Sequence, residues 1–459
     1  MKIKYTKKAL ASAIALSLMS VTYSGSTLAV SYDLCAKQGT ETMSDGTIIP
    51  MWGFVQAQDT ADFANNCALG IFSVPGPALT VPVGDNTLTI NVKNVDLPEA
   101  VSIVIPGQNT LMIPVMSALD SQLRRRVLSF THEASASGGS AEYTWSSMQP
   151  GTYAYRSGTH PAVQVQMGLY GAVTKDAAAG QAYAGATSAY DSETTVFYSE
   201  IDPVLHNQVA NMVTAGSGNT GPYATTSAYG TTGMTSTINY NPQYFLVNGD
   251  DSSTGTPVVG APGQTTLMRF INMGLQTHIP TLHNDDFAVL AEDGHAYSNV
   301  RNQYSVMVAA GQTRDALFTP QNTGDYVMFD RVLSLTNKTP PIVTAAAGDT
   351  LTSPGSLVTI LQVGTNADTD SVLDHKDNCL NQSNSSQLDT DNDGYGNACD
   401  ADLNNDGIVN GVDIPLFIQA FTVSSQLVDF NEDGYVNGLD IPYLINLFYK
   451  EPGPSGITN

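Results

Sequence analysis

The C-terminal part of the chain carries a 12-residue loop pattern that occurs twice. Asp, Asn, Asp, Gly, Asn and Asp stand at positions 1, 3, 5, 6, 9 and 12 of a loop that begins at Asp402, and the same order returns 27 residues later from Asp429. Calcium takes about six to eight hard oxygen ligands, and glycine at position 6 lets alternate side chains of such a loop converge on one ion, with a backbone carbonyl from position 7. The pattern predicts two calcium sites. Their expected ligands are Asp402, Asn404, Asp406, Ile408, Asn410 and Asp413 in the first loop, and Asp429, Asn431, Asp433, Tyr435, Asn437 and Asp440 in the second.

A third loop of the same spacing lies just upstream, from Asp389 to Asp400, and four further aspartates at positions 368, 370, 374 and 377 precede it. The run from residue 366 to 400, with its DNC and DTDNDGYGNACD segments, resembles a thrombospondin type 3 repeat. That resemblance implies a segment in which calcium ions and a disulfide take the place of a hydrophobic core. The expected ligands in the third loop are Asp389, Asp391, Asp393, Tyr395, Asn397 and Asp400.

Residues 401–450 resemble a dockerin, because each of the two later loops is followed by a short apolar helix, expected at 414–421 and 441–448. The resemblance implies calcium binding and a cohesin as partner. The chain departs from the dockerin pattern where cohesins are recognised, since it has Gly411-Val412 and Gly438-Leu439 in place of Ser-Thr. The partners left open are therefore a cohesin-type protein, another extracellular protein and a second copy of the chain. Residues 451–459 form a polar tail without a lipid or sorting signal.

The N-terminal residues have the features of a secretory signal peptide. Lysines at positions 2, 4, 7 and 8 precede the apolar run 9–19, and the small residues of 27–29 suit cleavage after Ala29. We therefore expect residues 1–29 to direct the chain to the extracellular space or the cell surface. In an oxidising compartment the four cysteines, which form two local pairs, should make two disulfides. These are Cys35 with Cys67, and Cys379 with Cys399.

The charge of the chain excludes some classes of partner. Its formal net charge is −24, which argues against binding to nucleic acid or to anionic membrane surfaces. Residues 366–459 hold 16 acidic residues against two lysines, so the order of this segment should depend on divalent cations. After the leader, no run reaches the roughly 18 apolar residues of a spanning helix, so we expect no membrane span.

Between the leader and the acidic segment, the chain is rich in Gly, Thr, Ser, Val and Tyr and shows short alternating runs separated by turns, as all-β proteins do. This spacing predicts a mostly β fold with two β-sandwiches, at 76–178 and 190–365, after an N-terminal segment at 30–75. A low-complexity stretch at 178–190 joins the sandwiches. A second one at 214–237 is expected to form a surface loop.

The two sandwiches resemble those of multicopper oxidases, whose domains have the cupredoxin fold. The segments that carry the resemblance are 76–85 with 92–94, 150–155 with 164–171, and in the second domain 245–249, 269–272, 291–294 and 309–315. The resemblance implies two cupredoxin-like sandwiches followed by a small calcium-loop and helical module. It also implies copper held by a cysteine thiolate and by His-x-His pairs.

The expected copper ligands are missing from the matching positions. Val104 and Pro106 stand where the first His-x-His pair would fall. The second pair would fall within 156–160: aligned from Tyr155 both of its ligands are lost, and aligned backwards from Gln164 His160 is kept and Gly158 replaces its partner. The paired cysteines leave no thiolate, and soft thiolate and imidazole ligands are what such copper sites need. A residual copper site is one alternative, built from His132, His160 and Met167.

No set of catalytic residues stands out, so the sequence favours a non-catalytic structural or interaction scaffold that binds calcium outside the cell. One alternative is a copper-dependent oxidase or copper carrier with an atypical His/Met site. A second alternative is a component of a polysaccharide-degrading complex, recruited by its dockerin-like residues 401–450.

Overall fold

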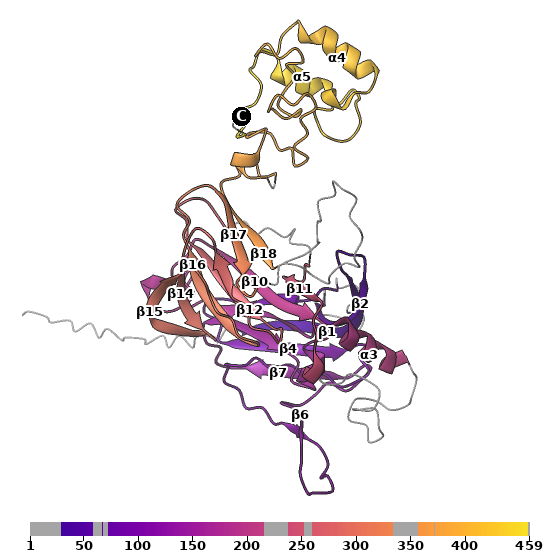
Figure 1. The fold of residues 1–459 in the computed structure, drawn as a ribbon, viewed down its shortest axis with the longest axis vertical. Coiled ribbons are helices and arrows are strands. Elements are labelled where there is room, and N and C mark those ends of the chain that lie inside the picture. Colours follow the sequence, from indigo (N-terminus) through magenta and orange to yellow (C-terminus); the bar gives the residue numbers. More distant parts are fainter. Residues whose placement is uncertain are drawn as a thin grey trace, which may run out of the picture.

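A computed structural model confirms the mostly β architecture, with two sandwiches and a small C-terminal module that contains helices (Figure 1). The expected signal peptide falls outside the described residues except for Ala29, and so does the low-complexity stretch between residues 214 and 237. None of the described helices is long and apolar enough to cross a membrane. The structure describes residues 29–57, 67, 72–214, 237–251, 259–333, 357–370 and 372–457.

The first sandwich has two sheets with the strand orders β2-β1-β4-β7 and β3-β9-β8. Apolar side chains alternate along β4, where Leu88, Ile90 and Val92 are buried and their neighbours are less so. With Trp145 and Tyr155 they form the core between the sheets. The strands are β1 (Ala29–Thr42), β2 (Ile48–Gln56), β3 (Gly76–Val81), β4 (Thr87–Asn94), β7 (Ser140–Trp145), β8 (Gly151–Arg156) and β9 (Tyr170–Lys175), and helix α2 (Pro161–Gln164) connects the last two.

The structure places the N-terminal segment inside this sandwich. From the sequence we expect residues 30–75 to form a segment separate from the first sandwich, but β1 pairs in parallel with β4 and antiparallel with β2. The parallel pairing of β1 with β4 joins residues 58 positions apart, and no local pattern reveals it. The first β unit therefore begins at β1.

The second sandwich pairs a six-stranded sheet, β11-β10-β12-β16-β14-β15, with a three-stranded sheet, β13-β17-β18. Phe287 lies at the centre of its core, with edge-on ring contacts to Phe270 and Phe318. The strands are β10 (Ser192–Ile201), β11 (Tyr244–Val247), β12 (Thr266–Asn272), β13 (Pro280–Leu282), β14 (Phe287–Glu292), β15 (His295–Gln303), β16 (Thr313–Phe318), β17 (Gly324–Asp330) and β18 (Val358–Val363).

The two sandwiches meet across a shared apolar cluster. Tyr170 of the first stacks on Phe197 of the second with ring centroids 5.3 Å apart, and Met51 and Ile271 belong to the same cluster. Helix α3 (Pro203–Thr214), which follows β10, packs on β2, and His206 Nδ1 lies 2.7 Å from the carbonyl oxygen of Pro50. The interface is therefore a packed core and not a linker.

The C-terminal module follows β18 and lies beyond the end of the second sandwich (Figure 1). It has a small core of its own, in which Phe417 stacks on Phe430 with centroids 6.0 Å apart and packs with Leu444. Both expected disulfides are present, Cys379–Cys399 in this module and Cys35–Cys67 beside β1. The helical elements are η4 (Asp374–Lys376), α4 (Asp413–Thr422), η5 (Gln426–Val428) and α5 (Ile441–Leu447), and shorter turns η2 (Ala186–Ser188) and η3 (Thr237–Asn239) lie upstream.

The polar tail after α5 turns back onto the disulfide segment. Gly456 N donates to Asp377 O at 2.7 Å, Leu380 N donates to Pro454 O at 2.9 Å, and Gly453 N donates to Cys399 O at 3.2 Å. The tail is therefore packed against the start of the module, which the sequence did not suggest.

A hairpin arm leaves the first sandwich between β4 and β7. It contains the two-stranded sheet of β5 (Val115–Met116) and β6 (Val127–Ser129). In Figure 1 the arm extends from the bottom of the molecule, away from both sandwiches.

Candidate metal centre

The two C-terminal loops have the same internal hydrogen bonds, 27 residues apart. Asp402 Oδ2 accepts from Gly407 N at 2.5 Å, and Asp429 Oδ2 accepts from Gly434 N at 3.0 Å. Both glycines have a positive φ, +96° and +84°, which a side chain rarely adopts. Each loop therefore bends sharply at position 6 and brings its first carboxylate inward.

The last carboxylate of each loop closes it in the same way. Asp413 Oδ2 accepts from Asn410 N at 2.7 Å, and Asp440 Oδ2 accepts from Asn437 N at 2.8 Å. Both aspartates are fully buried and stand where α4 and α5 begin. The repeated spacing in the sequence thus corresponds to a repeated three-dimensional loop.

The chemistry of these loops fits a hard cation. Asp429 is 1% exposed, and its Oδ1 has no hydrogen-bond partner. Burial raises the pKa of Asp429, and the nearby carboxylates of Asp440 and Asp433 add to the shift. A buried, unpaired carboxylate oxygen among like charges is costly unless a cation neutralises it.

The third loop gathers acids in the same manner. Carboxylate oxygens of Asp389, Asp391 and Asp393 all lie within 4.8 Å of one another. Burial raises the pKa of Asp400, at position 12, to about 7, and the charges of Asp393, Asp391 and Asp402 contribute. Asp400 Oδ1 accepts from Asp402 N at 2.7 Å, so the third loop is tied directly to the loop that follows it.

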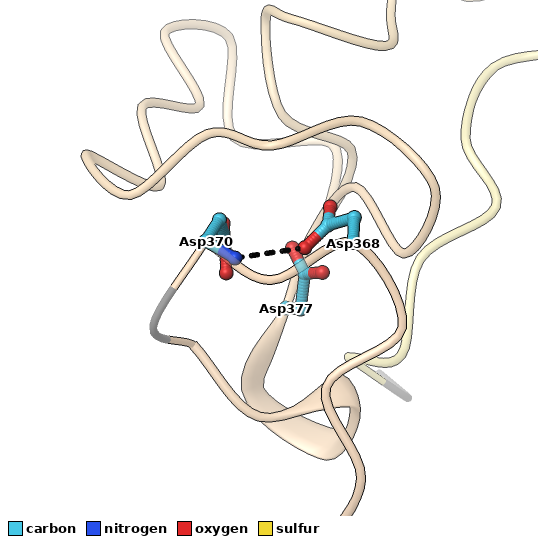
Figure 2. Close-up of side chains that lie close together, drawn as sticks. All are labelled: Asp368, Asp370 and Asp377. Carbon is cyan, nitrogen blue, oxygen red and sulfur yellow. Dashed lines mark hydrogen bonds between the residues drawn. The ribbon is translucent and has the colours of Figure 1, made fainter.

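A fourth group of acids was noted in the sequence but not assigned as ligands. Oxygens of Asp368, Asp370 and Asp377 lie within 4.8 Å of one another, and Figure 2 shows the three side chains converging. Asp377 is 1% exposed, and the Oδ2 atoms of Asp377 and Asp368 have no hydrogen-bond partner. In the sequence, the Asp-Thr-Asp triplet at 368–370 was the only local indication of this group. Its third acid, Asp377, lies seven residues after Asp370 and is not part of that triplet.

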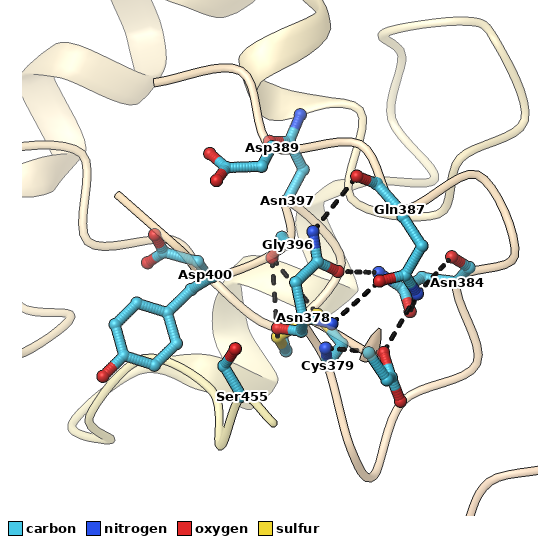
Figure 3. Close-up of a disulfide and its surroundings, with 12 residues drawn as sticks. Asn378, Cys379, Asn384, Gln387, Asp389, Gly396, Asn397, Asp400 and Ser455 are labelled. Carbon is cyan, nitrogen blue, oxygen red and sulfur yellow. Dashed lines mark hydrogen bonds between the residues drawn. A yellow bond between two sulfur atoms is a disulfide. The ribbon is translucent and has the colours of Figure 1, made fainter. Parts of the chain in front are cut away.

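The Cys379–Cys399 disulfide links the fourth acid group to the third loop (Figure 3). Asn378, beside the disulfide, accepts from Gly396 N through its backbone oxygen at 3.0 Å and donates from its backbone nitrogen to Gln387 Oε1 at 2.8 Å. Cys379 N donates to Asp377 Oδ1 at 2.8 Å. Acid groups, amides and disulfide therefore form one continuous network.

The two segments expected to hold copper in the first sandwich do lie together, but their side chains are hydroxyls and a carboxylate where a copper site would have imidazoles. The two segments do meet, because Val104 and Arg156 exchange backbone hydrogen bonds of 2.9 and 3.0 Å. Around them, Thr159 Oγ1 lies 2.9 Å from Ser102 Oγ and 2.8 Å from Glu133 Oε1. These are hydroxyl and carboxylate oxygens bonded to one another, so the donors do not fit a copper centre of thiolate and imidazole.

The three residues of the expected residual copper site are each engaged elsewhere. The ring nitrogens of His132 lie 3.2 Å from Thr131 Oγ1 and 2.8 Å from the carbonyl oxygen of Glu142. His160 Nδ1 lies 3.5 Å from Glu99 Oε2, and Met167 is fully buried in the hydrophobic core. Within the described part of the chain, the groups of three or more His, Cys, Asp or Glu side chains contain aspartates alone. The copper site stays a prediction that these contacts do not favour.

Two family models match segments of the chain. Residues 219–348 match the family model of the multicopper oxidases, and residues 400–449 match that of the dockerin type I domain. The chain joins a multicopper oxidase-like β region to a dockerin type I domain. No curated protein gives a sequence match.

The fold of the β region is similar to that of a solved copper oxidase, and two further solved structures give weaker matches. A blue copper oxidase from Nitrosomonas europaea is similar at 16% identity and a TM-score of 0.51, over 76% of this chain and 91% of that one. The multicopper oxidase mgLAC has 18% identity over 73% of this chain and 86% of its own, with a TM-score of 0.49. A copper nitrite reductase from Nitrosomonas europaea has 13% identity over 74% and 95%, with a TM-score of 0.47. At these identities the likeness concerns the fold alone.

Proposed function

We propose that this protein is a calcium-binding, non-catalytic scaffold of an extracellular assembly, to which its dockerin domain attaches it. The observation that carries the proposal is the pair of loops closed by the same hydrogen bonds at Asp402 and Asp429, each followed by a helix. The thrombospondin-like segment from residue 366 to 400 would bind further calcium and stiffen the connection to the sandwiches.

Calcium would supply positive charge where the chain collects negative charge. The expected ligands in the two dockerin loops and the third loop are those assigned from the sequence, and the group of Asp368, Asp370 and Asp377 adds a further candidate site. Residues 366–459 carry a net charge of −14, and bound cations would relieve the repulsion among them. The folded state of the module would therefore depend on calcium.

A scaffold role for the sandwiches is supported by the side chains found in the expected copper region, which are hydroxyls and a carboxylate. Thr159 is hydrogen-bonded to both Ser102 and Glu133, and all four cysteines are in disulfides. No redox step can be derived from such residues. The β region would instead present surfaces to other components of the assembly.

The dockerin domain offers two equivalent surfaces for a cohesin-type partner. Val412 and Leu439 stand at equivalent positions of the two loops and are 59% and 62% exposed. Ile418 in α4 and Ile445 in α5 also occupy equivalent positions, and they are 55% and 68% exposed. Because these pairs repeat at 27-residue spacing, a partner that binds one unit would meet a similar apolar surface on the other. We propose that recognition uses these apolar side chains in place of hydroxyl groups.

The first experiment is a measurement of metals in protein purified by its natural secretion route, with stoichiometry per chain. We expect about three or more calcium ions and no copper. Copper that stays bound through a mild chelator wash would instead favour the oxidase alternative and make His132 and His160 the residues to substitute first.

The second experiment tests the partner with immobilised type I cohesins, in calcium and in chelator. We expect calcium-dependent capture that survives either Val412→Asp or Leu439→Asp alone and is lost in the double variant. Val332→Asp, at a residue of the second sandwich that is 52% exposed, is the matched control and should bind normally. Failure of the unchanged chain to bind any cohesin would contradict the cohesin proposal, whatever the calcium content.

A further inference from the structure

We propose that the hairpin arm at residues 107–130 is an interface through which one copy of this chain docks onto the acidic surface of another. The arm combines exposed apolar side chains with three consecutive arginines. The arm lies between β4 and β7 in the sequence, two strands of one sheet of the first sandwich, and it projects away from that sandwich (Figure 1).

The apolar side chains of the arm face solvent in the single chain. Seven large apolar side chains along it are between 38% and 92% exposed, and such a concentration of exposed apolar groups indicates an interaction surface. They are Leu111, Ile113, Met116, Leu119, Leu123, Val127 and Phe130.

The root of the arm is firmly attached, in contrast to its outer part. Ser129 is fully buried and lies 3.1 Å from Thr159 Oγ1, Phe130 N donates to Gly158 O at 3.0 Å, and Met112 packs against the core of the first sandwich. The arm therefore leaves the sandwich in a defined direction. Beyond the root, Ser117 N donates to Arg126 O at 2.8 Å and Arg126 N donates to Ser117 Oγ at 2.9 Å.

An isolated two-stranded ladder has little stability in water unless something covers one of its faces. The arm nevertheless has an ordered tip, where Asp120 Oδ1 accepts from the backbone nitrogens of Gln122 and Arg124. Leu123 at this tip has φ +60° and is 79% exposed. Glycine would adopt this backbone conformation freely, whereas the side chain of a leucine disfavours it. An apolar side chain held outward in this way suits contact with a partner.

The charge of the arm identifies the partner. Arg124, Arg125 and Arg126 stand in succession with Asp120 as the single acid between residues 107 and 130, while the whole chain has a net charge of −24. Arg124 Nε pairs with Asp120 at 3.0 Å, so the arm keeps an excess of positive charge. A second copy, which also carries a net charge of −24, would attract this basic arm. An anionic membrane would attract the arm but repel the remainder of the chain.

Contact between an arm and a different surface of the next copy is a head-to-tail interface. Such interfaces give closed rings when the rotation between copies closes, and open filaments when it does not. The proposal therefore predicts an oligomer larger than one chain, with a mass that is sensitive to salt because the arm contributes charge.

The test is the molar mass of the secreted full-length chain by light scattering and sedimentation, in calcium and at low and high salt. We expect an oligomer at low salt that dissociates in the variant R124E/R125E/R126E and in the variant L111S/I113S. The control R301E/R331E/K450E makes the same change of charge at exposed sites elsewhere and should keep the oligomer. A circular dichroism spectrum equal to that of the unchanged chain shows that the variants fold.

A photo-reactive amino acid in place of Leu111, which is 92% exposed, identifies what lies on the arm. We expect a cross-linked product with the mass of two chains, joined between the arm and an acid-rich peptide. A chain that is monomeric up to about 100 μM at low salt, or an oligomer that persists unchanged in both arm variants, would overturn the proposal. So would cross-linking to lipid alone on vesicles containing anionic phospholipid.

Discussion

Arg269 of β12 donates to Asp176 of the first sandwich at 2.7 Å, although the two residues lie 93 positions apart. The same guanidinium donates to Thr152 Oγ1 at 2.8 Å, and Thr152 in turn donates to Asp315 at 2.6 Å. Burial acts to lower the pKa of Arg269, but the surrounding carboxylates, Glu193 among them, raise it, so Arg269 stays charged. A buried cation with partners from both sandwiches fixes their relative position.

Replacing Arg269 with methionine should loosen this interface. Because Asp176 and Asp315 would be left without their buried counter-charge, we expect a loss of about 3–5 kcal/mol in the free energy of unfolding. Arg301→Met is the matched control. Arg301 is exposed and lies over the Tyr297 ring at 5.0 Å, and we expect a loss of about 0.5–1 kcal/mol. Urea unfolding followed by tryptophan fluorescence measures both, and equal losses would contradict a special role for Arg269.

His278 should make the stability of the second sandwich depend on pH. Its ring nitrogens lie 2.8 Å from Glu200 Oε1 and 2.8 Å from Asp330 Oδ2, all buried. Burial alone would lower the pKa of His278, but the hydrogen bonds to Asp330 and Glu200 raise it to about 9. In an unfolded chain the pKa is about 6.5. The stabilisation is therefore complete below about pH 6.5 and is lost as the pH rises through about 9.

The measurement for His278 is the unfolding midpoint between pH 6 and 10, compared with His278→Gln. We expect the midpoint of the unchanged chain to fall over this range and that of the variant, lower at pH 6, to change less. His295→Gln is the control, because His295 is exposed and lies outside this carboxylate pair. Parallel pH profiles for the unchanged chain and His278→Gln would show that the buried histidine does not hold the extra proton.

Removal of calcium should unfold the C-terminal module and leave the sandwiches intact. We expect a chelator to open protease cleavage between residues 366 and 450, since the acidic loops would then repel one another. Asp429→Ala should give cleavage near the second dockerin loop even in calcium, whereas Asp286→Ala, at an acid outside the loops, should not. Identical digestion patterns with and without chelator would contradict calcium-dependent folding.

The Cys379–Cys399 disulfide should tighten the third loop and the acid group at 368–377. Its replacement by two serines is expected to lower the stability of the module by about 2–4 kcal/mol, because the unfolded segment gains freedom. Calcium affinity should fall at the same time, since the network around Asn378 depends on the bridge. Calorimetric calcium titration of this variant, beside the Cys35→Ser/Cys67→Ser variant as control, checks both effects. Unchanged affinity in the first variant would show that the calcium ligands are ordered independently of the bridge.

The features that could be predicted from the sequence are the local ones. The loops at 402–413 and 429–440 have fixed spacing between neighbouring residues, and each cysteine pair lies within a short segment, so the pattern itself carries the information. The alternation along β4 and the family resemblance likewise predicted two cupredoxin-like sandwiches, which the structural comparison confirms.

Features that depend on distant residues could not be predicted. The pairing of Arg269 with Asp176 and the burial of His278 between Glu200 and Asp330 join strands that only the folded sandwiches bring together. The arm escaped notice because its apolar residues resemble a strand that would be buried. Only the structure shows that residues such as Leu111 point to solvent.

The return of the tail to the disulfide segment gives the C-terminal module a mechanical property. Because Gly453 and Gly456 are hydrogen-bonded to Cys399 and Asp377, the chain enters and leaves the dockerin domain at one place. A force applied to α4 or α5 by a bound partner would be carried by these hydrogen bonds and by the Cys379–Cys399 disulfide. We expect residues 453–456 to resist detachment from the disulfide segment under such a load.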